Sequence, residues 1–192
     1  MQLPLFPLSS VVLPGGLMPL RLFERRYIDM VKECFRNGSG FGICLIRNGR
    51  EAGLPSEPFP MGTTVSIIDF DQGADGLLQI TARGEEEFKV LTYTSNDAGL
   101  IIGDVEILPP KEVTPMVADY ELLAKKLELI LSYLETDTRF EDQQLDDADW
   151  VCHRLLEVLP LEPDAKYELL QMPTNADRLQ ALSGLQIEIA ER

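Results

Sequence analysis

Residues 3–30 of the chain read LPLFPLSSVVLPGGLMPLRLFERRYIDM. The opening LPLFPL has the apolar content of a strand, but Pro4 and Pro7 cannot donate to a hydrogen-bond ladder, which predicts an edge or irregular strand. Pro14-Gly15-Gly16 predicts a turn, because glycine adopts positive φ without a steric penalty. A second extended piece is expected from Leu17 to Leu22.

A helix is expected over Glu24–Phe35. Its apolar side chains recur at the spacing of one helical face, and Asn37-Gly38 is a typical helix end. The residues on that face are Tyr27, Met30, Val31, Cys34 and Phe35.

Residues 40–108 have the pattern of a β-rich body. Leu78, Ile80 and Ala82 alternate with polar residues, as in a strand with one buried face, and the segment 101–107 alternates in the same way. Further strands are expected over Phe41–Arg47 and Met61–Asp71. Several short strands at this spacing favour a barrel or a strongly bent sheet.

Composition changes at Pro109-Pro110, so the sequence predicts two domains, 1–110 and 111–192. Thr114 followed by Pro115 is typical of a helix start. The apolar seam of the helix expected there comprises Met116, Tyr120, Leu123, Leu127, Ile130 and Leu134.

More helices are predicted at about 146–159, 163–171 and 175–190. Thr174 with Asp177 resembles a capping box at the start of the last one. The chain is therefore expected to be α+β, a β body with one helix followed by a helical bundle.

The 192-residue chain carries a net charge of −15. Such a charge repels nucleic acid at long range, so no nucleic-acid partner is expected. The N-terminus lacks the features of a signal peptide, and its prolines argue against a membrane helix. Cys34, Cys44 and Cys152 have neither metal-ligand spacing nor an even count, which favours buried thiols in a reducing compartment. The expected location is the cytoplasm, with no membrane partner.

No constellation for catalysis, cofactor binding or metal binding stands out. The sequence has no P-loop. The single histidine, His153, follows Cys152 directly, and adjacent helical residues point about 100° apart, so the two cannot form a dyad. We therefore predict no catalytic residue, no cofactor and no metal site.

The N-terminal motif resembles the opening of the Lon N-terminal domain family, which also includes stand-alone proteins and part of cereblon. The match rests on the quoted LPLFPL, on Val11-Val12-Leu13-Pro14-Gly15, and on Pro19-Leu20-Arg21-Leu22-Phe23-Glu24-Arg25-Arg26-Tyr27 with Met30. Gly62-Thr63-Thr64-Val65 and the helical tail resemble later parts of the family pattern. Glu87 stands before Phe88 where the family usually has arginine, so no ion pair is transferred to that position.

The resemblance implies a PUA-like β pseudo-barrel followed by a helical bundle. It also implies a non-catalytic module that recognises polypeptide segments or a partner protein, without the ATPase and peptidase parts of Lon proteases. Two alternatives stay open, a PUA-like nucleic-acid-binding domain and a small-molecule sensor. Fold alone does not decide among them.

The motif also supplies candidate site residues. Phe23 and Tyr27 are the predicted partner-facing side chains, because aromatic residues are enriched at interfaces. Pro14 and Gly15 are expected to set a turn. Glu24 and Arg26 are expected to bind each other or nearby backbone, since polar groups beside a buried segment need partners.

Overall fold

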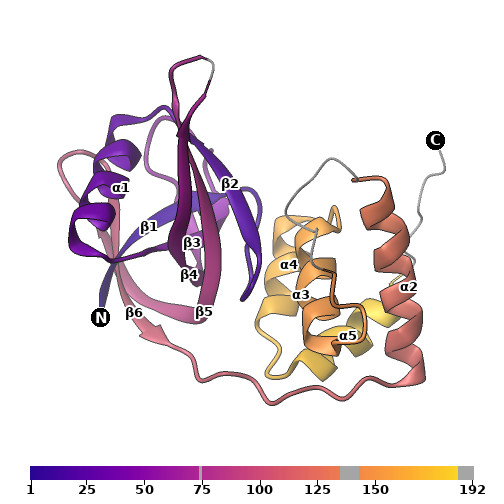
Figure 1. Cartoon of the computed structure of the whole chain (residues 1–192). Helices are drawn as coiled ribbons and strands as arrows, with labels where there is room; N and C mark the ends of the chain where they lie inside the picture. Colours follow the sequence, from indigo (N-terminus) through magenta and orange to yellow (C-terminus); the bar gives the residue numbers. More distant parts are fainter. Residues whose placement is uncertain (74, 135–142, 186–192) are drawn as a thin grey trace. The chain divides into compact units, whose positions relative to one another are not determined.

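The computed structural model describes residues 1–73, 75–134 and 143–185. The chain divides into two compact units, Met1–Pro110 and Lys111–Arg192. The labelled strands and helix α1 belong to the first unit, and helices α2–α5 belong to the second (Figure 1). The architecture is α+β, as the sequence predicts.

The first unit is built on a six-stranded mixed sheet with the order β2-β5-β4-β3-β1-β6. An additional β5–β6 pairing joins five of these strands into a closed ring, and β2 pairs with β5 alone. The elements are β1 (Gln2–Leu8), β2 (Leu17–Leu22), α1 (Arg25–Asn37), β3 (Phe41–Asn48), β4 (Glu57–Gln72), β5 (Leu78–Ser95) and β6 (Ile101–Ile107).

Strand β1 is not an edge strand, so that prediction is wrong. It lies between β3, its parallel neighbour, and β6, its antiparallel neighbour. The two pairings overlap only at Leu5, so Pro4 is paired with β6 alone and Pro7 with β3 alone. Each proline thus has a strand neighbour on one side only, which is where a missing N–H is tolerated.

The predicted turn at Pro14-Gly15 precedes β2. The Gly16 N–H donates to the Leu13 carbonyl at 2.8 Å, and Gly15 has φ +76°, as a type II turn requires at its third position. The turn lies against β5 at Gly84, where an added Cβ would come within 2.2 Å of the Leu13 carbonyl oxygen. Glycine at position 84 therefore permits the close approach from which β2 starts.

Helix α1 covers part of the sheet and begins directly after the motif. Its buried face includes Tyr27, Met30, Val31 and Cys34, as the periodicity predicts, and these side chains join the core of the sheet. Phe35, predicted on the same face, is exposed. Gly38, with φ +61°, ends the helix, so the predicted end is also confirmed.

The second unit contains α2 (Ala118–Ser132), α3 (Ala148–Val158), α4 (Pro163–Leu170) and α5 (Asn175–Ser183). The start expected at Thr114 is wrong, because Thr114 is buried and its N–H donates to Asp149 of α3 at 3.1 Å, while α2 begins four residues later. Leu123 and Leu127 of the predicted seam are buried. The last predicted helix ends at Ser183 in the structure, and residues 186–190 lie outside the described part of the chain.

A buried arginine links α4 and α5 in this unit. Arg178 donates to the carbonyls of Leu169 and Leu170 at 3.2 and 2.7 Å, and so caps the C-terminal end of α4 with a cation. It also donates to Asn175 at 3.3 Å. The predicted capping box of Thr174 and Asp177 is present at the start of α5.

No helix among residues 1–73, 75–134 and 143–185 has both the length and the apolar character needed to cross a membrane.

Candidate functional site

A groove of about 310 Å³ follows strand β2 in the first unit. Most of its wall is apolar, and Ser10, Glu24 and Glu51 supply polar groups. Its apolar lining consists of Phe6, Leu8, Met18, Pro19, Leu20, Leu22, Phe23 and Tyr27. The groove therefore collects side chains from β1, β2 and the start of α1, which are the segments of the N-terminal motif.

Phe23 is the exposed aromatic residue of this groove. It lies between the end of β2 and the start of α1, and 59% of its surface remains accessible to solvent. An exposed aromatic ring beside an apolar groove is the arrangement found at protein-binding surfaces, where aromatic anchors carry much of the binding energy. Its position fits the predicted partner-facing role, which stays a prediction.

Tyr27 is buried, as its place on the apolar face of α1 predicts, and is not exposed as a partner-facing side chain would be. It is 5% exposed, and its ring stacks on Phe6 with 3.8 Å between centroids and 15° between planes. Burial raises the pKa of Tyr27 to about 12, with a smaller contribution from the nearby carboxylates of Glu24 and Glu51. Tyr27 thus forms part of the groove wall instead of presenting its ring at the surface, and its role in binding stays a prediction.

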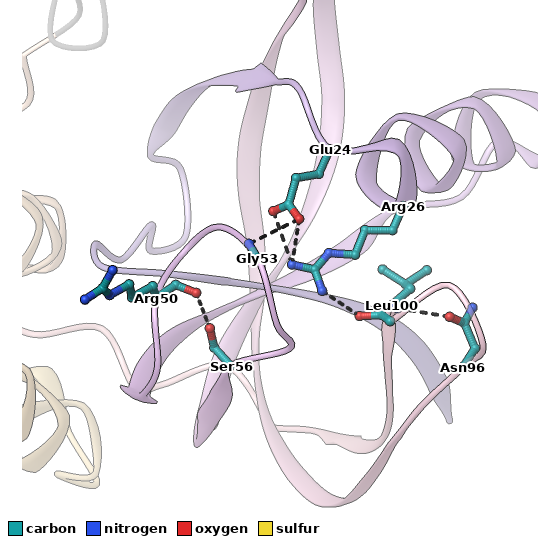
Figure 2. Close-up of polar contacts among 8 residues, drawn as sticks. Glu24, Arg26, Arg50, Gly53, Ser56, Asn96 and Leu100 are labelled. Carbon is teal, nitrogen blue, oxygen red and sulfur yellow. Dashed lines mark hydrogen bonds and ion pairs between the residues drawn. The ribbon is translucent and has the colours of Figure 1, made fainter.

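Glu24 and Arg26 form an ion pair at the N-terminal end of α1 (Figure 2). The Arg26 guanidinium is 3.0 Å from the Glu24 carboxylate and donates to the Gly99 carbonyl at 2.8 Å. Its side chain is almost fully buried. The pair therefore fastens the turn between β5 and β6 to the helix start.

The same pair reaches the loop between β3 and β4. The Gly53 N–H donates to the Glu24 carboxylate at 3.4 Å, and the loop is closed by a hydrogen bond from the Ser56 hydroxyl to the Arg50 carbonyl (Figure 2). Glu51 of this loop accepts hydrogen bonds from both the backbone N–H and the hydroxyl of Ser9. These contacts hold the Glu51 carboxylate at the groove, among its lining residues.

The groove offers groups for non-covalent binding. Its lining offers apolar surface, one serine hydroxyl, the guanidinium of Arg21 and two carboxylates. Within the described residues, no group of three His, Cys, Asp or Glu side chains is arranged to hold a metal ion. The arrangement suits the binding of an apolar segment with a positive charge nearby.

A family model described as the ATP-dependent protease La (LON) substrate-binding domain matches residues 2–185. The chain belongs to the Lon substrate-binding domain family. The resemblance stated from the N-terminal motif is thereby confirmed, and so is the predicted fold class.

Solved structures agree with the family assignment. A Lon N-terminal domain protein from Xanthomonas campestris is 41% identical, with a TM-score of 0.76 over 95% of this chain and 96% of that one. The N-terminal domain of a Lon protease from Mycobacterium avium complex is 18% identical with a TM-score of 0.58, which shows a shared fold.

Curated relatives are longer proteins. Lon protease from Haemophilus influenzae is 23% identical over 95% of this chain, and cereblon from Gallus gallus is 27% identical over 62% of it. The chain spans 24% of that Lon protease and 27% of cereblon, about a quarter of each.

The sequence predicted some of the residues that line the groove of this Lon domain and missed others. Phe23, Glu24 and Tyr27 come from the motif, whereas Glu51 lies in a loop without any distinguishing pattern. Its place depends on contacts with Ser9, which is far away in sequence. One usable signal for the groove was Pro19, because proline within a strand indicates a sheet edge.

Proposed function

We propose that this protein is a non-catalytic recognition module that binds apolar segments of polypeptides in the groove along β2. The observation that carries the proposal is the exposed ring of Phe23 beside an apolar groove, at the position of the family's most specific motif. Membership of a family described as substrate-binding supports a polypeptide as the ligand. The groove's two carboxylates disfavour a nucleic acid, and its guanidinium, that of Arg21, is paired with Asp75.

The expected affinity is modest. A shallow groove with one aromatic anchor is compatible with a Kd in the micromolar range, or about −8 kcal/mol. Weak binding of this kind suits a module that samples many unfolded chains. We place this activity in the cytoplasm, and three buried cysteines that are not joined in disulfides support a reducing compartment.

The proposal is tested with a fluorescently labelled, alkylated model protein that cannot fold. Titration with the Lon-domain protein should raise the fluorescence anisotropy of this probe with a micromolar midpoint. Phe23→Ala should weaken binding about tenfold or more, because anchor residues at interfaces cost about 2 kcal/mol or more when truncated. An unchanged midpoint for Phe23→Ala would show that the model protein does not bind at the groove.

Tyr93→Ala provides the matched control. Tyr93 is also an exposed aromatic residue of the first unit, on β5, and it does not line the groove. Its truncation should leave the midpoint unchanged. Equal weakening by both variants would point to non-specific adhesion of apolar surface.

A further inference from the structure

Strand β2 has one strand neighbour among the described residues, β5, and so forms an edge of the sheet. An edge strand presents unpaired N–H and C=O groups to which another extended chain can hydrogen-bond. The register of the β2–β5 pair shows which groups these are.

The Gly84 N–H donates to the Gly16 carbonyl at 2.8 Å, and the Gly84 carbonyl accepts from the Gly15 N–H at 2.9 Å, so Gly84 of β5 directs both its backbone groups toward the start of β2. The register then continues without a shift to the last pair, Leu22 with Leu78. Hydrogen-bonded and non-hydrogen-bonded pairs alternate in an antiparallel ladder. Leu17, Pro19 and Arg21 therefore occupy the non-hydrogen-bonded positions and direct their backbone groups away from β5.

Pro19 fits this assignment. At an outward-directed position its missing N–H costs no bond to β5. The free edge thus offers the carbonyls of all three residues and the N–H groups of Leu17 and Arg21. Outside the β2–β5 ladder, no turn or loop backbone group among the described residues is hydrogen-bonded to them.

The groove lies along this same edge. Every residue from Met18 to Leu22 lines it. Successive side chains of a strand point to opposite faces, so a wall made of consecutive residues follows the strand's edge. A chain laid beside β2 would direct alternate side chains into the groove, over Phe6, Leu8 and Tyr27.

The charge at the groove favours a cation on that chain. Glu51 has neutral hydrogen-bond partners, the N–H and hydroxyl of Ser9. Glu24 is paired with Arg26, and Arg21 forms an ion pair with Asp75. Glu51 is accordingly the carboxylate of the groove to which a lysine or arginine of a bound segment could add a charge-assisted contact.

We propose that β2 takes up an extended polypeptide segment as an additional strand, with apolar side chains in the groove and a basic side chain near Glu51. The inference rests on the proposed function and adds the conformation and the chemistry of the ligand. Main-chain hydrogen bonds would supply affinity that is independent of sequence, and the groove would select alternate apolar side chains.

The test uses the wild-type protein and a short blocked peptide in which valine alternates with threonine and one end carries lysine. Two derivatives carry backbone N-methyl groups, one at the odd positions and one at the even positions. Only one edge of an added strand faces β2, so one derivative should bind about tenfold more weakly than the parent, and the other should bind within about threefold of it. Equal affinity of the two derivatives, whether retained or lost, would overturn strand addition.

A pair of protein variants gives an independent readout. Arg21→Pro removes an outward N–H without removing a bond to β5, while Arg21→Ala removes the side chain and keeps that N–H. Peptide binding should be at least about tenfold weaker with Arg21→Pro than with Arg21→Ala, at matched melting temperatures, because both variants lack the side chain and only the first lacks the N–H. Should Arg21→Pro fail to fold, the methylated peptides still decide the question.

The outcomes separate the two proposals. If the parent peptide and the unfolded model protein both fail to bind, the proposed function itself is wrong. If both bind and the methylated pair shows no difference, the groove binds side chains without strand addition. Replacing the lysine of the peptide by glutamate should weaken binding for wild type and have less effect for Glu51→Gln, and the same loss in both proteins would exclude Glu51 as the contact.

Discussion

The rings of Phe6 and Tyr27 stack at 3.8 Å and thereby connect the first strand of the sheet to its helix. Phe6 belongs to β1 and Tyr27 to α1, and both side chains are buried in the same hydrophobic cluster. This stack forms the floor of the groove whose rim carries Phe23. The two aromatic residues near the start of α1 thus differ in their roles, because Tyr27 lies in the core and Phe23 lies at the surface.

Truncation of these two residues should therefore separate stability from binding. Tyr27→Ala should lower the free energy of unfolding by about 3–5 kcal/mol, because it leaves a cavity in the core. Phe23→Ala should change it by less than about 0.5 kcal/mol, as is usual for surface sites. Urea unfolding of both variants provides the measurement, and a large loss of stability for Phe23→Ala would place that residue in the core.

The ion pair of Arg26 with Glu24 should contribute far more to the free energy of unfolding than the ion pair formed by the preceding residue, Arg25. Arg26→Ala leaves the Glu24 carboxylate and the Gly99 carbonyl without their partner and should cost about 3–5 kcal/mol. Arg25 pairs with Asp29 on the exposed side of the helix, so Arg25→Ala should cost less than about 0.5 kcal/mol. Similar chemical denaturation midpoints for the two variants would contradict the role assigned to Arg26.

Tyr27 should also make stability depend on alkaline pH. Its pKa in the folded protein is about 12, above the ordinary value near 10 that applies in the unfolded chain. The unfolded state loses this proton first, so the stabilisation is complete below about pH 10 and is lost as the pH rises toward about 12, by at most about 1.4 kcal/mol per pH unit. The difference in unfolding free energy between wild type and Tyr27→Phe should change over this range, and parallel pH profiles would argue against it.

The two units should fold as separate domains. Fragment 1–110 retains the closed ring of strands, because the β5–β6 pairing lies entirely within it. Fragment 111–192 retains the contacts of Arg178 with α4. We expect each fragment to show a cooperative thermal transition by circular dichroism. A fragment 1–110 that melts without cooperativity would show that the ring depends on the rest of the chain.

Local sequence signals predicted the parts of the fold that depend on local chemistry. The turn at Gly15, the helix end at Gly38 and the capping box at Thr174 each follow from a backbone preference or a short-range hydrogen bond. Alternation predicted strands at residues 78–83 and 101–107, although β5 continues beyond the first of these segments to Ser95.

Features that depend on distant partners were not predictable. The stacking of Tyr27 in α1 on Phe6 in β1 depends on the tertiary fold, and Thr114 does not start a helix because its N–H donates to Asp149. Pro4 and Pro7 suggested an edge strand, since a sequence cannot show that the two neighbours of β1 pair with different halves of it. The groove belongs to this class too, because Glu51 reaches it through a loop held by Ser9.

Amide chemical-shift mapping tests whether unfolded polypeptide binds in the groove along β2. Isotope-labelled protein is titrated with the alkylated model protein, and shifts are followed residue by residue. We predict that the largest shifts fall on residues 17–24 and on Glu51, with a micromolar midpoint. Saturable shifts confined to other parts of the chain, such as the exposed Leu122 and Leu129 of α2, or no shifts at all, would contradict the claim.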